Sequence, residues 1–448
     1  MEKSIRKEIM TYAIPGILGL VANSLYIVVD GIFVSKMLGA KSLAAVTTVV
    51  PVVEILIALS LMIAIGGGIH ISIQKGRNNL EESRYYFNQG FYFVIGISIL
   101  ILIGSMVFRN SIVTLLGATP EIYEEALNYF TWFMMFVPFF TLNYALGTWI
   151  RNDGKPNLAM FAQVIGALAN IVLDYIFMGP MKMGIAGAAI ATGLGPVIGI
   201  ALLLPHFIFK KGDLYIEKVR PKVSYINDIL VGGLPSFSIE FSLGLMSFLM
   251  NLFIAKSMGA EGLAAFGVIG YINLILLSVF LGIGQGTQPL VSRFYGEHDI
   301  ESIKEVYNFS VILSIVFGLV SYGLLLVTRS TVIGIFVEAH DTEVIALCFT
   351  AITYFFFSYC VTGVNVATAS IFEAKHSVLF SVLISLFRSF IILVPMLFIM
   401  NGFPNASALW LAVPLTEIIT LPFSLILWNK DFKKTKSDFK LHESTSNL

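Results

Sequence analysis

The sequence contains little charge. Asp, Glu, Lys and Arg together make up 12% of its 448 residues, against about 25% in soluble proteins. The 28 basic and 28 acidic residues cancel, so the net charge gives no reason to expect a nucleic-acid partner. Hydrophobic residues make up 57% of the chain, and its mean hydropathy is +0.85. These values exclude a chain of soluble domains and predict a multi-pass protein of the lipid bilayer.

Motifs typical of enzymes and ATP-driven pumps are also missing. The chain has no G-x-x-x-x-G-K-[ST] loop, no H-E-x-x-H sequence and no Cys/His spacing typical of a metal site. Its two cysteines, Cys348 and Cys360, share one apolar segment and form no disulfide framework. The glycine-rich GIGQGTQ at 282–288 lies inside an apolar run, which favours close helix packing over dinucleotide binding. We expect no enzymatic activity. We also expect no bound cofactor other than Na⁺, if Na⁺ is the coupling ion.

Long apolar runs are what the sequence has in abundance. The first run is too long for a cleavable signal peptide. The runs predict about twelve membrane spans, at 12–35, 43–73, 87–108, 128–150, 158–179, 184–209, 228–254, 262–292, 306–327, 344–372, 378–400 and 409–428. The prediction is an all-α integral membrane protein. Its parts are an N-terminal lobe (1–209), a cytoplasmic linker (210–227), a C-terminal lobe (228–429) and a polar cytoplasmic tail (430–448).

The positive charges are distributed unevenly between the two sides of the membrane. Most of the 28 Lys and Arg residues fall in segments on the same side as the N-terminus, including the linker and the tail. Segments that are rich in Lys and Arg stay in the cytoplasm. We therefore expect both termini to be cytoplasmic in a protein of the cell membrane.

The two halves of the chain are repeats. The stretch 11–45 aligns with 231–265 without a gap, and Pro15 and Pro235 are among nine identical pairs. The same offset pairs Gly66 with Gly286. Because six spans separate equivalent positions, both halves enter the membrane with the same polarity. Parallel repeats of this kind are a plan of secondary transporters, with a central site expected between the halves.

The repeat breaks at four polar residues. Each polar residue lies in the first half, and the residue aligned with it in the second half is apolar. The aligned pairs are Asp30 with Met250, Asn170 with Phe390, Asp174 with Val394 and Thr192 with Ala412. A charge such as that of Asp30 costs about 2.5–3.5 kcal/mol at the centre of a span, so an intramembrane acid is a functional-site hypothesis by default. Asn170 and Asp174 share one helix face because they are four residues apart. Counted from the external span ends, all four residues lie roughly 9–18 Å deep, within one layer.

These four residues predict a site for a hard cation or a proton. Two carboxyls, an amide oxygen and a hydroxyl form an all-oxygen set of the kind that hard cations prefer. The alternative is a cluster of hydrogen bonds between helices with no bound ion. Tyr26, one turn before Asp30, is either a cap on this site or an ordinary packing residue.

Other intramembrane polar residues are candidates for a cavity or substrate path. Glu54, Gln163, Glu240 and Arg388 form this set. Burial in lipid would be costly for the charged members, so we expect them to face partners or water. Glu240 and Arg388 are candidates for a pair within the second half.

Taken together, several stretches of the chain resemble the multidrug and toxic compound extrusion (MATE) family of transporters. The stretches are DGIFVSKMLGAKSLAA (30–45), IRNDGKPNLAMFAQVIGALANIVLDYIF (150–177), GIAGAAIAT (184–192) and GIGQGTQPLVSRFYGE (282–297). The resemblance covers essentially the whole chain. It implies twelve helices in two six-helix lobes around a V-shaped cavity, and export of cationic, amphipathic compounds in exchange for Na⁺ or H⁺.

The resemblance also implies which residues act. Family members use an acid on the first span, an Asn and an acid on the fifth, and a Thr on the sixth. These positions correspond to the four residues at which the repeat breaks. Some members also pair acids on the seventh and tenth spans, whereas here the tenth offers only Glu373, near its cytoplasmic end. The rival hypotheses are a lipid-linked precursor flippase of the same two-by-six plan and a membrane enzyme.

Overall fold

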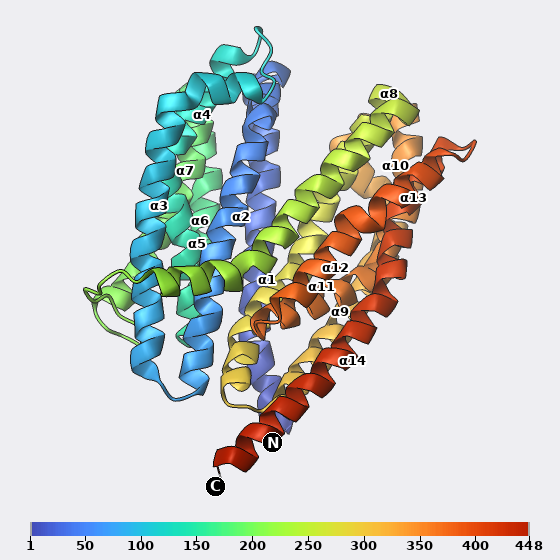
Figure 1. Cartoon of the computed structure of the whole chain (residues 1–448). Coiled ribbons are helices and arrows are strands. Elements are labelled where there is room, and N and C mark those ends of the chain that lie inside the picture. The colour runs from blue at the N-terminus through green and yellow to red at the C-terminus, as the bar shows by residue number, and fades with distance from the viewer. Residues whose placement is uncertain (1, 447–448) are drawn as a thin grey trace. The chain divides into compact units, whose positions relative to one another are not determined.

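The computed structural model describes residues 2–446 and is built from helices, with no strand among these residues (Figure 1). The first half contains α1 (Glu2–Phe33), η1 (Val34–Leu38), α2 (Ala40–Gly76), α3 (Leu80–Leu115), α4 (Tyr123–Met135), α5 (Val137–Asn152), α6 (Pro156–Met178) and α7 (Gly184–Ile208). The second half contains α8 (Val223–Gly296), α9 (Ile300–Phe336), α10 (Thr342–Phe355), η2 (Phe356–Ser358), α11 (Tyr359–Ala374), α12 (Val378–Leu386), η3 (Phe387–Ile391), α13 (Leu393–Asn401), η4 (Ala406–Leu411) and α14 (Ala412–Ser446). The all-α prediction is confirmed.

The number of membrane spans follows from two irregular helices. Within residues 2–446, ten helices are long and apolar enough to cross a membrane, and there are eleven if the bent pair α4 and α5 is one span. The axis of this pair bends by 50°. The 74-residue α8 is itself two helices, because Gly259 interrupts it with φ 66° and ψ −151°. Counting the pair as one span and α8 as two gives the predicted twelve.

The interruption in α8 has a counterpart in the first half. Gly39 separates η1 from α2 with φ 91°, and Gly259 is the residue that the repeat pairs with Gly39. Positive φ angles of this kind favour glycine, since a Cβ atom is strained there. The repeat that the sequence predicts is therefore visible in the backbone at one specific turn of each half.

The chain forms two compact units. Unit 2 comprises Ile14–Phe237, and unit 1 comprises Met1–Ala13 together with Ser238–Leu448. Figure 1 shows the helices of unit 2 mainly in blue to green and those of unit 1 mainly in yellow to red. Both boundaries fall inside a helix, α1 and α8, close to Pro15 and Pro235. The predicted lobes follow the order of the spans instead and differ from the units at 1–13 and 228–237. The predicted division into two lobes and a linker therefore stays a prediction.

In each unit, a glycine packs closely against the start of a helix that comes from the other half of the chain. These starts are the first residues of α1, in unit 1, and of α8, in unit 2. In unit 2, a Cβ atom added to Gly66 of α2 would lie 2.7 Å from the backbone nitrogen of Gly233 in α8. In unit 1, a Cβ atom added to Gly286 would lie 2.7 Å from the carbonyl oxygen of Tyr12 in α1. Only glycine permits backbones to approach so closely. The same contact thus occurs once in each unit.

The last helix extends beyond the apolar segment. Residues 430–446, predicted as a polar tail, continue α14 and dock onto unit 1; 447–448 lie outside the described residues. Phe439 is buried with its ring centroid 5.5 Å from that of Tyr295. Lys436 pairs with Glu301 at 2.8 Å. The tail is therefore an amphipathic helical extension, and its cytoplasmic location stays a prediction.

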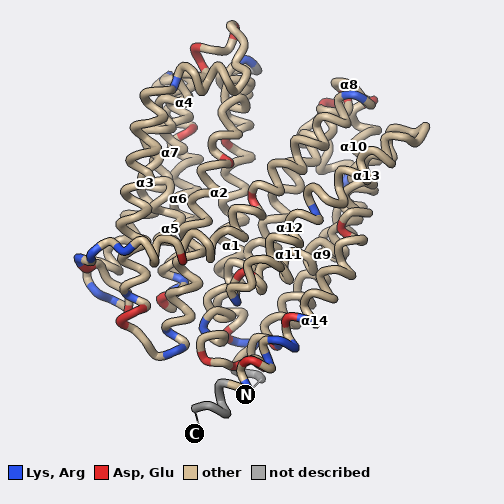
Figure 2. The backbone as a smooth tube through the Cα atoms, in the orientation of Figure 1, with Lys and Arg blue, Asp and Glu red and all other residues tan. Residues whose placement is uncertain are grey.

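Charged residues lie mainly at helix ends in both units (Figure 2). The few that lie within spans are consequently the informative ones. In unit 2 the helices α6 and α7 approach closely at two glycines, which positions the polar residues beside them. A Cβ atom added to Gly166 would lie 3.0 Å from the carbonyl oxygen of Gly195, and one added to Gly195 would lie 3.6 Å from the Cβ of Asn170.

Candidate functional site

The structure brings together the four residues at which the repeat breaks, all within unit 2. Asp30 lies near the end of α1, Asn170 and Asp174 on one face of α6, and Thr192 on α7. The side chains of Asp30 and Asp174 lie within interaction distance of each other. Two ionised carboxylates this close repel one another, whereas a proton on one of them would convert the contact into a hydrogen bond. The arrangement therefore favours a proton or a cation between the two acids.

Asn170 connects the acid pair to α7. With its amide nitrogen facing Asp174, the Nδ2 of Asn170 donates to Oδ2 of Asp174 at 3.1 Å. Its Oδ1 then accepts a hydrogen bond from the backbone N–H of Thr192 at 3.2 Å. Both side chains on α6 are buried, with exposed fractions of 2% for Asn170 and 0% for Asp174. Asn170 therefore fixes the position of Asp174 relative to two helices.

Two carboxyl oxygens of the site are left without partners. Oδ1 of Asp30 and Oδ1 of Asp174 are both buried and accept no hydrogen bond from any described residue. An unsatisfied buried acceptor is destabilising by roughly 1–3 kcal/mol, and more when it is charged. Two such atoms on adjacent acids are the feature that a purely structural hydrogen-bond cluster would avoid. Both Oδ1 atoms are therefore available to bind a proton or a cation.

Tyrosines surround the acid pair. Tyr26 lies one turn before Asp30 on α1, in the neighbourhood of Tyr129 and Tyr144. The hydroxyl of Tyr129, on α4, lies beside that of Thr192, whose Oγ1 donates to the carbonyl oxygen of Ala188 at 3.0 Å. Tyr129 is 4% exposed. The site thus draws on α1, α4, α5, α6 and α7 of one unit.

Tyr129 and Tyr144 were not among the predicted residues, although the sequence contains a signal for them. The offset that aligns the two halves places Phe349 opposite Tyr129 and Val364 opposite Tyr144. Both tyrosines therefore show the same polar-to-apolar break as the four predicted residues.

Two other predicted cavity residues of unit 2 lie apart from the acid pair. The side chain of Gln163 on α6 packs over Gly19 of α1, where an added Cβ atom would lie 2.0 Å from Oε1 of Gln163. Glu54 on α2 is exposed. Neither residue contacts the carboxyl groups of the site in the interactions described above, and their role in binding a substrate stays a prediction.

The remaining candidates, Glu240 and Arg388, belong to unit 1. Arg388 lies in the π-helical segment η3 and donates two hydrogen bonds to Oε1 of Glu417, from Nε at 2.9 Å and from Nη2 at 2.7 Å. Glu417 in turn accepts a hydrogen bond from Asn365 at 2.7 Å. The exposed fraction of the Arg388 side chain is 12% and that of Glu417 is 4%. This ion pair connects η3, α11 and α14 inside the spanning region.

The oxygen atoms of the unit 2 site suit a small, hard ligand. Asp30 and Asp174 supply carboxyl oxygens, and Thr192 and Tyr129 supply hydroxyls. Carboxylate, hydroxyl and amide oxygens are ligands of hard cations, and adjacent acids are also acceptors for a proton. The residues of the site come from several helices, so a ligand bound there would contact more than one of them.

Duplicated six-span halves and an acid pair buried inside one of them define a multi-pass membrane transport protein rather than an enzyme. The comparison with known families agrees with this class. The family model for MatE matches residues 15–176 and 235–399, which covers both halves. The chain belongs to the MatE family of membrane transporters, and the resemblance seen in the sequence is confirmed.

Curated relatives match along nearly the whole chain. A protein of Staphylococcus saprophyticus named multidrug export protein MepA is 21% identical over 431 residues, which cover 95% of this chain and 94% of that protein. A MepA protein of Staphylococcus aureus is 23% identical over 433 residues, with the same coverage.

Solved structures match the fold. An outward-facing conformation of a multidrug resistance MATE family transporter of the MOP superfamily superposes with a TM-score of 0.92, at 23% identity, and covers 97% of both chains. A MOP superfamily transporter from Pyrococcus furiosus gives a TM-score of 0.90 at 24% identity, covering 96% of this chain and 97% of that one. The fold class is therefore that of MATE transporters, with twelve helices in two parallel repeats.

Proposed function

We propose that this protein is a multidrug efflux antiporter that exports cationic, amphipathic compounds in exchange for Na⁺ or H⁺ by alternating access. Membership of the MatE family and relatives named as multidrug export proteins support the export of varied small molecules. The distribution of Lys and Arg supports an orientation in the cell membrane with both termini in the cytoplasm.

One observation carries the coupling part of this proposal. Oδ1 of Asp30 and Oδ1 of Asp174 are buried and without partners among the described residues, although their carboxyl groups lie within interaction distance of each other. A proton or a Na⁺ ion bound at the pair would provide a partner for these oxygens and reduce the repulsion between two ionised acids. The empty and the loaded site therefore differ in the forces between α1 and α6, which gives a cation a means to favour one conformation over another.

The ion gradients supply the free energy for export. Exchange of one monovalent cation for one monovalent cationic compound moves no net charge, so it is driven by the concentration gradient of the coupling ion, at about 1.4 kcal/mol for each factor of ten. Each coupling ion beyond the charge of the compound also gains about 2.3 kcal/mol in a potential of about 100 mV, which sustains a further ratio of several tens-fold. In the cycle that we propose, Asp30 and Asp174 take up an external cation while the compound leaves, and release it on the cytoplasmic side.

Dye efflux from vesicles, with sodium and pH gradients imposed separately, tests the proposal. Efflux is expected to follow one of the two gradients in the natural protein and to vanish in Asp30→Asn and Asp174→Asn. Glu121→Gln is the matched control, because it removes one carboxylate from an exposed position in the same unit. Gradient-driven efflux at the natural rate in a well-folded Asp30→Asn protein would show that this acid pair does not couple transport.

The lipid-linked precursor hypothesis receives less support from the structure. A transporter of anionic headgroups needs cationic groups that are available to bind them. Arg388, the one base predicted within a span, is instead engaged by Glu417. Unchanged dye levels under both gradients, together with movement of a lipid-linked sugar in the same vesicles, would favour that hypothesis.

A further inference from the structure

The segment that joins the halves runs along α3 in an irregular conformation and is held there by two neighbouring amides. Nδ2 of Asn88 donates to the carbonyl oxygen of Tyr215 at 3.0 Å, and its Oδ1 accepts from the backbone N–H of Glu217 at 2.8 Å. Gln89 repeats the arrangement further along, donating to the carbonyl oxygen of Arg220 at 2.6 Å and accepting from the N–H of Lys222 at 3.2 Å. The segment is therefore a fixed part of unit 2.

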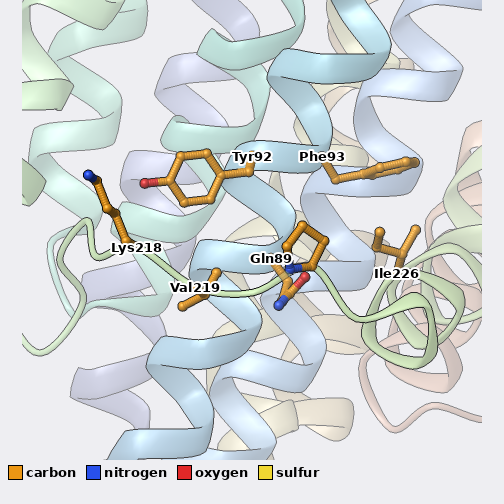
Figure 3. Close-up of a pocket in the computed structure, with 7 residues that line it drawn as sticks. Gln89, Tyr92, Phe93, Lys218, Val219 and Ile226 are labelled. Carbon is orange, nitrogen blue, oxygen red and sulfur yellow. The ribbon is translucent and has the colours of Figure 1, made fainter.

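A cavity of about 500 Å³ lies between this segment and α3. It is lined by Gln89, Tyr92, Phe93, Lys218, Val219, Pro221 and Ile226 (Figure 3). Its volume falls within the roughly 300–1,000 Å³ typical of small-molecule sites. Most of its lining is aliphatic or aromatic. In Figure 3 the side chains of Lys218 and Tyr92 extend toward the same side of the pocket.

Lys218 lines the cavity, and Arg220 lies in the chain between Val219 and Pro221, which also line it. Within this part of the chain, the side chains of Lys218 and Arg220 form no ion pair, hydrogen bond or cation–π contact, and both residues are exposed. Their neighbours are engaged: Lys210 lies 4.4 Å from the ring centroid of Tyr215, and Lys222 lies 5.0 Å from that of Tyr85. The free positive charge of this segment is thus concentrated at the cavity.

The cavity lies where α3 changes from polar to apolar. The first turns of α3 carry LEESRYYFNQ, and from Gly90 onward the helix is a membrane span. Tyr92 is 40% exposed and Leu100 is 65% exposed, as expected for side chains that face lipid. Tyrosines are common at the level of the lipid headgroups. An apolar cavity with free cations at this level meets the leaflet on the side of the linker.

We propose that this cavity binds an anionic phospholipid of that leaflet, with an acyl chain against Tyr92, Phe93 and Ile226 and the phosphate between Lys218 and Arg220. The charges complement an anionic headgroup and repel the cationic compounds of the proposed export function. The apolar lining favours a lipid over a soluble anion, since it would bury part of the acyl chain. The inference stands on the geometry of the linker and does not depend on antiport.

Lipid retention by the purified protein tests the proposal directly. The natural protein, Lys218→Gln/Arg220→Gln and the control Lys210→Gln/Lys211→Gln would each be incubated with phosphatidylglycerol or phosphatidylcholine in mixed micelles. Native mass spectrometry then counts the lipids that remain bound. The control removes the same charge from the same linker without altering the cavity. We expect preferential retention of phosphatidylglycerol, lost roughly tenfold or more in the first variant and preserved in the control.

Equal loss in both double variants would overturn the proposal, because it would show a general attraction to the basic linker. Equal retention of both lipids by the natural protein would overturn it as well, because it would show no selection of an anionic headgroup.

A second measurement covers the case of a variant that does not fold. Tyr92→Trp keeps both cations and reports on the cavity through fluorescence quenching by phosphatidylglycerol with brominated acyl chains. Quenching at Tyr92→Trp beyond that at Tyr175→Trp, an exposed site on α6, supports the proposal, and equal quenching at the two sites contradicts it. Neither experiment measures transport, so their outcome is separate from that of the efflux assay.

Discussion

Asp30 and Asp174 lie within interaction distance of each other in the membrane-spanning region, while the Oδ1 atom of each remains without a partner among the described residues. Asp30 ends the long apolar face of α1, whereas Asp174 is held by an amide of its own helix. The pair is therefore asymmetric: one acid is fixed by α6 and α7, and the other is carried by a helix that both units share. A ligand of this pair acts on the position of α1.

The first prediction concerns the stability of the empty and the loaded site. The coupling ion, Na⁺ or H⁺, should stabilise the natural protein, by about 2.7 kcal/mol at a concentration one hundred times its dissociation constant. Thermal unfolding in detergent, with Na⁺ and pH varied separately, measures this effect. Asp174→Asn should unfold at a temperature that no longer responds to that ion, because the acid pair is gone. A response equal to that of the natural protein would show that the ion binds elsewhere.

The second prediction concerns the hydroxyl of Tyr129. Tyr129→Phe removes a hydroxyl oxygen beside Thr192 at the acid pair and should weaken binding of the coupling ion about fivefold, as expected for the loss of roughly 1 kcal/mol. The measurement is the half-saturating concentration of the coupling ion in the efflux assay. Tyr175→Phe is the control, since this tyrosine of α6 is 55% exposed. Equal effects of the two substitutions would exclude a role of the Tyr129 hydroxyl at the site.

The third prediction concerns the turn that the two halves share. Gly39→Ala should destabilise the protein by about 1–2 kcal/mol, because φ is 91° and an L-residue is strained there. An added Cβ atom meets nothing within 4 Å at this position, so the effect comes from the backbone alone. Gly104→Ala, in the interior of α3 and equally open, should be neutral or stabilising. Unfolding midpoints compare the two, and a neutral Gly39→Ala would mean that the turn relaxes.

The fourth prediction concerns the buried ion pair of unit 1. Glu417→Gln leaves the guanidinium of Arg388 without its carboxylate partner and should destabilise the protein by about 3–5 kcal/mol. The double variant Arg388→Met/Glu417→Leu should recover most of this loss, because it removes both charges together. Glu301→Gln is a control at an exposed pair and should change stability by less than about 1 kcal/mol. A double variant as unstable as the single one would indicate that the pair fixes the packing of η3.

The sequence predicted the twelve spans and the residues of the acid site because both depend on composition and on the internal repeat. A charged residue in an apolar run is visible without coordinates, as for Asp30, and its apolar counterpart Met250 marks the asymmetry. The same comparison contains Tyr129, which was overlooked. The position of Gln163 over Gly19 was not predictable, because the sequences of two packed helices do not specify their relative register.

The boundaries of the two units were also not predictable from the chain. The uninterrupted apolar run of α1 gives no local sign that contacts change between Ala13 and Ile14. The π-helical form of η3 is similar, since the sequence of Phe387–Ile391 marks Arg388 as a charged residue in a span but gives no sign of a π-helix. Its form depends on contacts with other helices, among them the pair between Arg388 and Glu417.

Neither half of the chain contains the whole of a unit. Unit 2 lacks the helix start that packs against Gly66 until synthesis has passed Phe237, and the segment Met1–Ala13 has no final neighbours until Gly286 and its helix exist. The halves exchange equivalent segments, as the subunits of a domain-swapped dimer do. During biosynthesis, the start of α1 is therefore made well before the residues of the second half with which it packs, and it reaches its native contacts only after they exist.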